Sequence, residues 1–453
     1  MQVTNQSRAF GALTIVTLCL CPAILRGQDS QYWTIQYGPV AELLGGVVVG
    51  TTRDLSATYY NPGALALAKD PSVLASVSSF EYTRITATSI PPILDFQDSN
   101  ITPSPSLFAF ALPKSWTGRH TVAFSALTRQ DMDLRVDNWQ VTPSHQAGGE
   151  SLFDQSLNEN WFGVTWAHSV GEQIGLGVTT YAAYRGHRAR KEVSAEAALS
   201  ATQGAAGLLV EDFDYSNYRL LWKVGISTQR RAWDLGLSLT TASVRLFGTG
   251  SASYTRSTVG ADLGSGPAVS VAVQHQDDLE SRYESPWSIA AGGGYRKGQN
   301  VFHATVEWFG KVEGFDVLDT SSFASDPAAA DLLKRLHQQA KSVVNFGVGY
   351  ERKVSDRLSC YGAFTTDFTF ADEQESGTNS LSTWDIYHLS AGTSLAIAGV
   401  KLTLGAEYAT GKDTRSFTAL VVPPEGAPAL ASLPLEVKYS RFRVLLGFDF
   451  SHR

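Results

Sequence analysis

The amino-acid sequence predicts an all-β protein, a transmembrane antiparallel β-barrel of about 14 strands, and four observations carry this prediction. Segments of alternating apolar and polar residues recur through most of the 453 residues. Beyond the N-terminus, no run approaches the roughly 18–20 apolar residues of a membrane helix. The alternating segments are about 11–17 residues long, against about 5–6 for typical strands of soluble proteins. Short and long connections also alternate, as in barrels with short periplasmic turns and long extracellular loops.

The N-terminus carries the pattern of a secretory signal. A positively charged start is followed by an apolar stretch over residues 9–21 that ends near Gly27, so residues 1–27 are predicted to be a signal peptide. Its removal takes away two arginines and no acidic residue, which moves the formal net charge from −7 to −9. An acidic chain gives no basis for nucleic-acid binding. Of three cysteines only Cys360 lies beyond the signal, so neither an internal disulfide nor a cysteine metal site is expected.

Composition and aromatic placement fit a membrane barrel. Charged residues make up 17% of the chain, against about 25% in ordinary soluble proteins. The 40 glycines and the 11% of aromatic residues suit strands and tight turns. In residues 299–309, Phe302, Val306 and Trp308 alternate with polar residues, and aromatics recur near the ends of such apolar faces. That placement predicts the aromatic girdles of a barrel.

Fourteen segments are predicted to be barrel strands, an even number as in single-chain bacterial barrels. They are 73–86, 106–113, 120–136, 158–169, 172–187, 216–229, 231–247, 286–297, 299–313, 342–354, 357–370, 385–397, 400–411 and 437–450. Residues 73–453 would then form the barrel, with long loops outside the cell and both chain ends on the periplasmic side of a bacterial outer membrane. A soluble sandwich also alternates, but it has no reason to sort its loops by length.

Residues 28–72 precede the first strand and follow no repeating pattern. An apolar, glycine-rich stretch over residues 40–50 leads to Asp54 and then to the tetrapeptide Asn61-Pro62-Gly63-Ala64. Pro62 fixes its own φ and pushes Asn61 out of the helical region, while Gly63 is expected to free the next step, so a tight turn is predicted.

With these features in place, the chain resembles the FadL family, outer-membrane barrels that take up long-chain fatty acids and other hydrophobic molecules. Residues 54–65, DLSATYYNPGAL, look like that family's acidic, small-residue lead into Asn-Pro-Ala-Gly-Leu. Gly45, Gly46 and Gly50 look like its glycine-rich plug segment. The sequence departs from the pattern in two places. Gly and Ala are exchanged after Pro62, and three residues follow Phe450, where barrel assembly signals usually end on the aromatic itself.

The resemblance implies that residues 28–72 form a plug inside the lumen. The turn around Asp54, Asn61, Pro62, Gly63 and Ala64 would act as the latch where plug becomes wall. An ordinary turn that feeds the first strand is the alternative.

The resemblance also implies capture of a ligand at the outer loops and sideways release into the membrane through a kinked strand. The strand 120–136 is the candidate wall beside that exit, and its charged face, expected to point into the lumen, comprises Arg129, Asp131, Asp133 and Arg135. Apolar loop residues that would capture ligand are Leu208, Leu209, Phe323, Leu332, Leu333 and Leu336, the last three on a helix predicted over 326–342. Packing of these loops on themselves is the alternative.

The residues favour transport over chemistry. His187, His275, His337 and His388 are scattered without a catalytic motif, so no enzyme activity, cofactor or metal is expected. The predicted partners are a hydrophobic, fatty acid-like small molecule and outer-membrane lipids, with the chain a monomer. The alternative function is an accessory barrel of a protein secretion or surface-attachment system that docks proteins through its loops.

Overall fold

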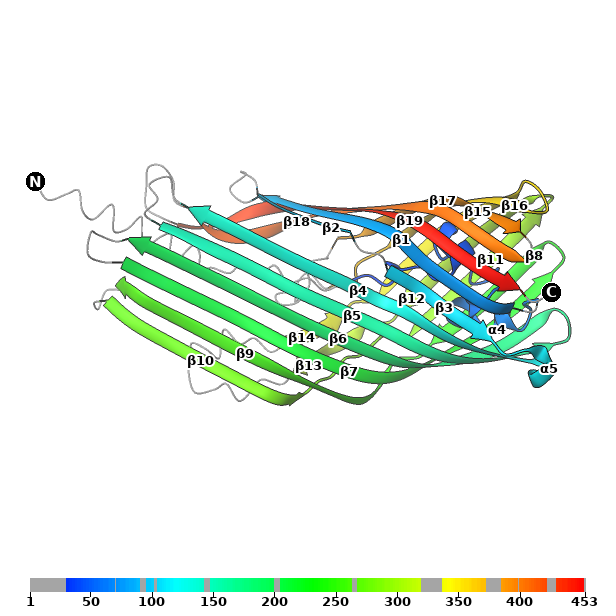
Figure 1. The fold of residues 1–453 in the computed structure, drawn as a ribbon, viewed down its shortest axis with the longest axis horizontal. Helices are drawn as coiled ribbons and strands as arrows, with labels where there is room; N and C mark the ends of the chain where they lie inside the picture. Colours follow the sequence, from blue (N-terminus) through cyan, green and yellow to red (C-terminus); the bar gives the residue numbers. More distant parts are fainter. Residues whose placement is uncertain are drawn as a thin grey trace, which may run out of the picture.

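The computed structural model describes residues 30–69, 71–89, 95–101, 104–141, 147–198, 204–262, 267–318, 336–371, 384–397, 399–421 and 429–451. The predicted signal, residues 1–27, lies outside these ranges. Within them the chain forms a closed antiparallel barrel of 14 strands, as predicted (Figure 1). The barrel strands are β1 (Pro71–Ser89), β3 (Ser104–Ala111), β4 (His120–Val141), β5 (Ala147–Val170), β6 (Ile174–Ala198), β7 (Gly204–Arg230), β8 (Trp233–Thr240), β11 (Ser288–Lys297), β12 (Asn300–Phe309), β15 (Val343–Lys353), β16 (Leu358–Asp367), β17 (Ile386–Ile397), β18 (Val400–Val421) and β19 (Ala429–Ser451).

Pairing between the first and last strands closes the ring. β1 pairs antiparallel with β19 over the whole of its length and with β3 on its other side. Each of the fourteen predicted strands overlaps one barrel strand. Two predicted strands were too long. The segment 231–247 contains β8 and the start of a separate strand at Val244, and within the segment 299–313 the barrel strand β12 ends at Phe309.

Five further strands lie outside the ring of fourteen. They are β2 (Asp95–Ile101), β9 (Val244–Asp262), β10 (Pro267–Glu280) and the hairpin of β13 (Val312–Leu318) and β14 (Leu336–Ala340). β9 pairs with the part of β7 that extends beyond β8, and β10 pairs with β9. These two strands therefore enlarge the sheet outside the ring of fourteen strands.

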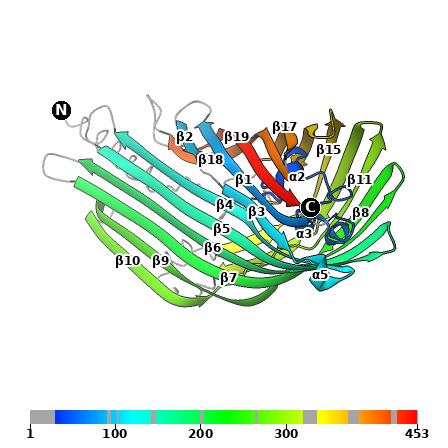
Figure 2. The same cartoon turned by 45° about the vertical axis from the view of Figure 1, so that its right-hand side comes forward.

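The wall of the barrel has very unequal heights. β5, β6 and β7 have 24, 25 and 27 residues, whereas β11, β12 and β16 have 10 each. About 9–11 tilted residues cross a membrane, and a strand rises about 3.3 Å per residue. The tall wall therefore extends far past any bilayer that the short wall spans. Figures 1 and 2 show this extension of β4–β7, β9 and β10 at the end of the barrel opposite the C-terminus.

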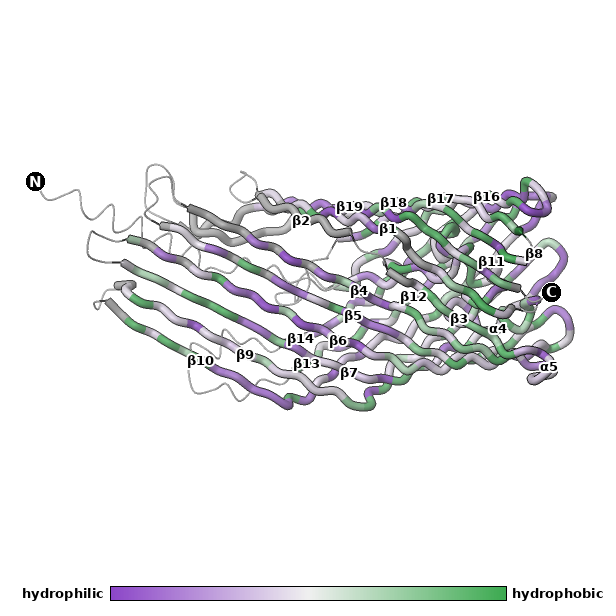
Figure 3. The backbone as a smooth tube through the Cα atoms, in the orientation of Figure 1, coloured by the Kyte–Doolittle hydropathy of each residue, from purple (hydrophilic) through white to green (hydrophobic). Residues whose placement is uncertain are grey.

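Much of this extension was predicted to be loop. Residues 137–157, 188–215 and 412–436 lie largely within strands. A strand outside the bilayer does not need one apolar face, so the alternation that marks a membrane strand fades while the hydrogen-bonded ladder continues. Figure 3 shows hydrophilic stretches along this extension and more hydrophobic residues in the opposite half of the barrel.

Short connections gather at one end of the barrel, which we call the short-turn end. They include residues 171–173, 231–232, 298–299 and 354–357, and the β3–β4 connection, which holds the short helix α5 (Lys114–Thr117). None of the helices in the described ranges is long and apolar enough to cross a membrane.

The N-terminal segment, residues 30–69, packs within the ring of strands. It contains three single-turn helices, α2 (Pro39–Leu43), α3 (Ala57–Tyr60) and α4 (Pro62–Leu65), two of which Figure 2 labels among the surrounding strands. The side chains of these helices join inward-facing residues of the strands in one buried cluster. Along β12 the inward-facing residues are buried while Phe302, Val306 and Trp308 are exposed on the outer face, as an apolar lipid-facing surface requires.

Candidate functional site

The Asn61 turn connects the N-terminal segment to the barrel wall. Asn61 is extended, with φ −161° and ψ 96°, as the following proline demands. Its Oδ1 accepts a hydrogen bond from the Gly63 backbone N–H at 3.1 Å, which caps α4. Its Nδ2 donates to the carbonyl oxygens of Val49 and of Ile226 in β7, both at 2.9 Å. One buried amide thus joins the turn, the preceding stretch and the wall.

Glycines allow this turn to touch the wall backbone to backbone. A Cβ added to Gly63 would lie 2.5 Å from the carbonyl oxygen of Gly225 and 2.7 Å from that of Gly175. A Cβ on Gly177 or Gly225 would overlap the Pro62 carbonyl or the Asn61 side chain. Gly63 itself is helical and lies outside the positive-φ region, so it is required for close approach and not for the conformational freedom that we predicted.

We therefore expect Gly225→Ala to displace the turn from the wall. The added methyl would occupy the position of the Asn61 amide and leave the carbonyl of Ile226 without its donor, a loss on the order of 1–3 kcal/mol. Hydrogen exchange of residues 57–66 should become faster, measured by mass spectrometry on the folded barrel. Gly362→Ala is the matched control, because its Cβ would meet its nearest atom at 3.7 Å. Equal protection in both variants would mean that the close contact does not hold the turn.

A second set of contacts holds the beginning of the N-terminal segment. Asp367, buried at the end of β16, accepts hydrogen bonds from the backbone N–H groups of Tyr32 and Trp33 at 3.0 and 2.9 Å. The guanidinium groups of Arg441 and Arg443 in β19 both donate to the Thr34 carbonyl at 2.8 Å. The segment is therefore anchored on opposite parts of the ring at its two ends.

Helix α2 docks through a buried carboxyl group. Glu42 accepts hydrogen bonds from the hydroxyls of Ser76 in β1 and Ser106 in β3. Burial raises the pKa of Glu42 to about 7, against the opposing effect of these two donors. The helix thus meets the wall with a carboxyl group that is protonated in mildly acidic solution.

A small cavity lies between the N-terminal segment and the tall wall. Its volume is about 40 Å³, room for a few water molecules at most. Aromatic rings dominate its lining: Tyr32, Tyr59, Trp161, Tyr283, Phe309 and Phe370. These rings come from the segment, from β5 and β12, and from the connections after β10 and β16.

Two buried cations face this aromatic cavity. The Lys223 ammonium lies 4.5 Å from the centre of the Tyr59 ring, and the Arg129 guanidinium lies 5.8 Å from that of Trp161. Both side chains are buried, and neither forms an ion pair with a carboxylate in the described ranges. The cavity lining also includes the carboxylates Glu159 and Glu307. The cavity thus combines apolar rings with charged groups of both signs.

Two carboxylates also line this cavity: Glu307 accepts hydrogen bonds from Trp33 Nε1 at 2.8 Å and the Ser288 hydroxyl at 2.7 Å, and Glu159 lies in a cluster of ion pairs. Glu159 in β5 forms ion pairs with Arg185 in β6 at 2.8 Å and Arg219 in β7 at 2.7 Å. Both guanidinium groups stack on the Tyr283 ring, at 3.9 and 4.5 Å from its centre. This cluster bridges three strands of the tall wall, and Lys223 and Arg129 take no part in its ion pairs.

The predicted latch residues lie on either side of α3. Asp54 accepts hydrogen bonds from the backbone N–H and the hydroxyl of Ser56, at 2.8 and 2.5 Å, just before α3. Ala64 is fully buried in α4, beside Pro62 and Gly63. The structure places Asn61, Pro62, Gly63 and Ala64 together at α4, against β6 and β7, whereas Asp54 makes its hydrogen bonds on the other side of α3; action of the five as a latch stays a prediction.

The predicted charged face of β4 is wrong for three of its four residues. Arg129 is buried inside the barrel, but Asp131, Asp133 and Arg135 are exposed. A β-bulge between Thr128 and Gln130 shifts the register against β5, and an extra residue reverses which side chains point inward. Beyond it, Arg135 pairs with Asp154 on the outer face at 3.7 Å.

Three of the six predicted capture residues lie within the described ranges, and all three belong to strands. Leu208 and Leu209 lie in β7, where Leu209 is buried against Val193 and Tyr254 on the inner face. Leu336 begins β14, so the helix predicted over 326–342 is wrong for residues 336–340. Phe323, Leu332 and Leu333 lie outside the described residues. In the described ranges, no group of three or more His, Cys, Asp or Glu side chains is placed to hold a metal ion.

Sequence reasoning missed most of the cavity. Trp161, Lys223 and Glu159 occupy inward positions of strands that were predicted correctly. These residues alternate with the apolar residues of the outer face. That alternation could have predicted their place in the lumen, because polar residues in the middle of a membrane strand must face the lumen.

Several solved structures that match this chain are outer-membrane channels or transporters. The chain matches a Pseudomonas aeruginosa FadL homologue with a TM-score of 0.58, at 11% identity, over 93% of this chain and all of the other. The chain has the FadL-type barrel fold. The Pseudomonas putida toluene transporter TodX matches with a TM-score of 0.58 at 10% identity, over 95% of this chain and 100% of TodX. The monoaromatic hydrocarbon channel CymD matches with a TM-score of 0.52 at 12% identity, over 93% of this chain and 98% of CymD.

No protein-family model matches the sequence, and no curated protein sequence matches it either. At identities of 10–12%, the FadL-type likeness shows the fold, and the ligand has to be argued from this chain's own residues.

Proposed function

We propose that this chain is an outer-membrane channel for the uptake of hydrophobic molecules, with an acidic amphiphile such as a long-chain fatty acid as its ligand. The observation that carries the proposal is the cavity of aromatic rings beside Lys223 and Arg129, two buried cations that form no ion pair within the described residues. Aromatic rings accept an apolar chain, and two cations beside them accept a carboxylate. The solved channels of the same fold bear names that refer to toluene and monoaromatic hydrocarbons, which supports hydrophobic ligands in general.

The N-terminal segment favours a route in which the ligand displaces plug residues over one in which the ligand diffuses through a water-filled lumen. The described cavity beside the segment has a volume of about 40 Å³, too small for an acyl chain. We propose that residues 28–72 act as a plug and that a ligand enters by moving Tyr59 or its neighbours. Exit would be sideways into the membrane, because an apolar ligand gains nothing by crossing a watery path when lipid is adjacent.

In the orientation that we propose, the short-turn end faces the periplasm and the tall wall stands outside the cell. Short turns on the periplasmic side are the rule in bacterial barrels. The last described residues of β19 lie at the short-turn end, where Phe450 pairs with Val400, whereas Ser30 lies at the other end of β16, where its carbonyl accepts a hydrogen bond from the Phe370 N–H.

The ligand class has a direct test. We expect the double variant Arg129→Met, Lys223→Met to weaken binding of a 12-carbon fatty acid by about tenfold or more, or about 1.4 kcal/mol, since the carboxylate loses both cations. Binding of the uncharged 12-carbon alcohol should change little. Titration calorimetry of the detergent-solubilised barrel measures both. Arg190→Met, on the outer face of β6, is the control. Equal losses for acid and alcohol would contradict a head-group site.

The accessory-barrel function remains a second candidate because the tall wall offers a large surface outside the bilayer. Mass spectrometry of gently solubilised protein separates the two. Co-purified fatty acid or another apolar ligand supports uptake, while a stable protein partner without such a ligand supports docking.

A further inference from the structure

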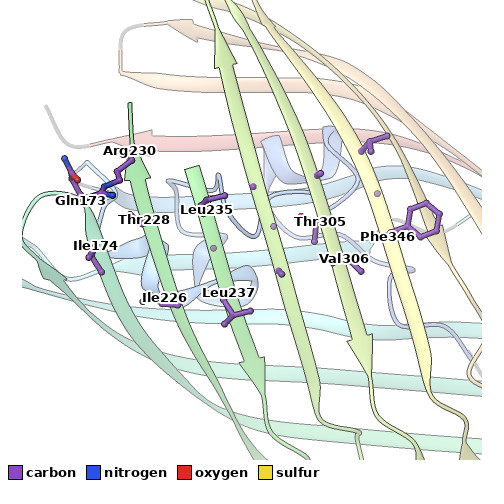
Figure 4. A pocket seen from close by; sticks show the side chains of 17 residues that line it. Gln173, Ile174, Ile226, Thr228, Arg230, Leu235, Leu237, Thr305, Val306 and Phe346 are labelled. Carbon is purple, nitrogen blue, oxygen red and sulfur yellow. The ribbon is translucent and has the colours of Figure 1, made fainter. Parts of the chain in front are cut away.

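A large groove lies on the outer, lipid-facing surface of the barrel, across β6–β8, β11, β12 and β15. Its volume is about 1060 Å³. Figure 4 shows Ile226, Leu237, Val306 and Phe346 along its lining. The apolar groups that line it are exposed on the outer face, so the groove is separate from the cavity inside the lumen. A barrel wall is normally convex, so a hollow of this size needs a structural cause.

Small residues placed side by side form the floor of the groove. Gly293 of β11 pairs with Ala304 of β12, and Ala291 is the next outward-facing residue of β11. Larger residues flank this floor: Leu235 and Leu237 on the β8 side, and Val306, Phe346 and Val348 toward β15. An apolar chain lying across the strands would thus touch side chains on both sides and main chain beneath.

The groove is apolar along most of its length and polar at its short-turn end. Thr228 and Arg230, the last outward-facing residues of β7, line it there together with Gln173. Beside them, the rings of Trp233 and Tyr295 pack at 4.6 Å on the outer face of β8 and β11. Such a ring pair marks the membrane–water interface.

Positive charge gathers beyond this aromatic pair. Arg230, Lys297 and Arg352 end the outer faces of β7, β11 and β15, and all three are exposed. None forms an ion pair with a carboxylate in the part of the chain that the structure describes. Glu172, in the neighbouring turn, offsets this charge only in part. The groove therefore ends in an unneutralised cationic edge at the depth of lipid head groups.

We infer that this groove binds one anionic phospholipid from the membrane leaflet at the short-turn end. An acyl chain occupies the hollow over Gly293 and Ala304, and the phosphate group meets Arg230. The combination of a hollow, an interfacial ring pair and unpaired cations matches the three parts of such a lipid, its chain, its glycerol region and its anionic head. The inference goes beyond uptake and depends only on the outer face lying in lipid.

Native mass spectrometry of the full-length, detergent-solubilised barrel tests the inference. The protein is incubated with phosphatidylglycerol or with phosphatidylcholine of the same acyl chains. We expect one phosphatidylglycerol to stay bound, at an occupancy at least fivefold above that of phosphatidylcholine. Arg230→Gln should lower phosphatidylglycerol occupancy at least fivefold, and Ala304→Leu should lower it similarly by filling the floor.

Matched controls separate this site from general effects. Arg119→Gln removes an exposed arginine from the β3–β4 turn, and Ala391→Leu enlarges an exposed alanine on the outer face of β17. Both should retain the lipid. Ala291→Leu and Lys297→Gln replace any test variant that does not give the compact, heat-modifiable form of a folded barrel.

Two results would overturn the inference. One is equal retention of both lipids that neither test variant changes. The other is a pair of barrels that Ala304→Leu separates, because the groove would then hold a second copy of the chain. Fatty acid binding through Lys223 is measured independently, so failure of the lipid site leaves the uptake proposal to its own test.

Discussion

Deleting residues 28–60 should raise the single-channel conductance of the barrel by about tenfold or more. Residues 30–69 pack across the lumen with contacts to β7, β16 and β19, and a ring of 14 strands is wide enough for water once that segment is gone. Planar-bilayer recordings of the refolded protein measure the change. The deletion keeps β1 intact, because that strand begins at Pro71.

The control for this deletion has to show that the ring still closes. Resistance to heat and detergent on gels reports a folded barrel. Gly362→Ala, which keeps the N-terminal segment intact, is measured in the same assay for comparison. If the folded deletion variant conducts no better than the wild type, then something other than residues 28–60 blocks the lumen, and the proposed plug is wrong.

Leu237→Arg should destabilise the barrel by roughly 2–4 kcal/mol, since a charge would face lipid in the middle of a membrane strand. Leu237 is 48% exposed on the outer face of β8, between Gly236 and Ser238, which face inward. Denaturant titration in lipid vesicles measures the free energy of unfolding. Leu176→Arg, in β6, should have a similar effect because that side chain is also exposed outward.

Val354→Arg is the matched control for the two leucine variants. Val354 is exposed as well, but it lies in the β15–β16 turn at the short-turn end, where a charge costs about 0–1 kcal/mol. Equal costs at positions 237 and 354 would mean that the outer face of β8 does not face hydrocarbon.

The sequence predicted the barrel well wherever a strand had to place one face in lipid. Val306 and Trp308 alternate with Thr305 and Glu307 because hydrocarbon and lumen impose opposite demands, and β12 was found correctly. The upper part of β7 obeys no such demand, so Leu208 and Leu209 were assigned to a loop. Beyond the bilayer, the hydrogen-bonded ladder alone defines the strand, and a single sequence does not display the ladder.

The site was predictable only in part, for a related reason. The Asn61 turn carries its own local chemistry, and Pro62 sets the conformation of its neighbour from sequence alone. The bulge at Thr128 has no such local signal, yet it decides that Arg129 faces the cavity while Asp131 faces out. Contacts such as Gly63 with Gly225 join residues more than 160 positions apart, so they emerge only when the ring is assembled.

The way the ring closes sets an order of assembly. Neighbours such as β5 and β6 are joined by three residues and pair without a register shift. The loss of chain entropy on forming such a hairpin is therefore small, and its pairing can extend from the turn. The seam between β1 and β19 joins Pro71 to Ser451 and must wait for the last strand of the chain. β1 follows α4 almost directly, so the strand that closes the ring is tethered to the segment that the ring encloses. Closing the seam and enclosing residues 30–69 are thus coupled through a connection of a few residues.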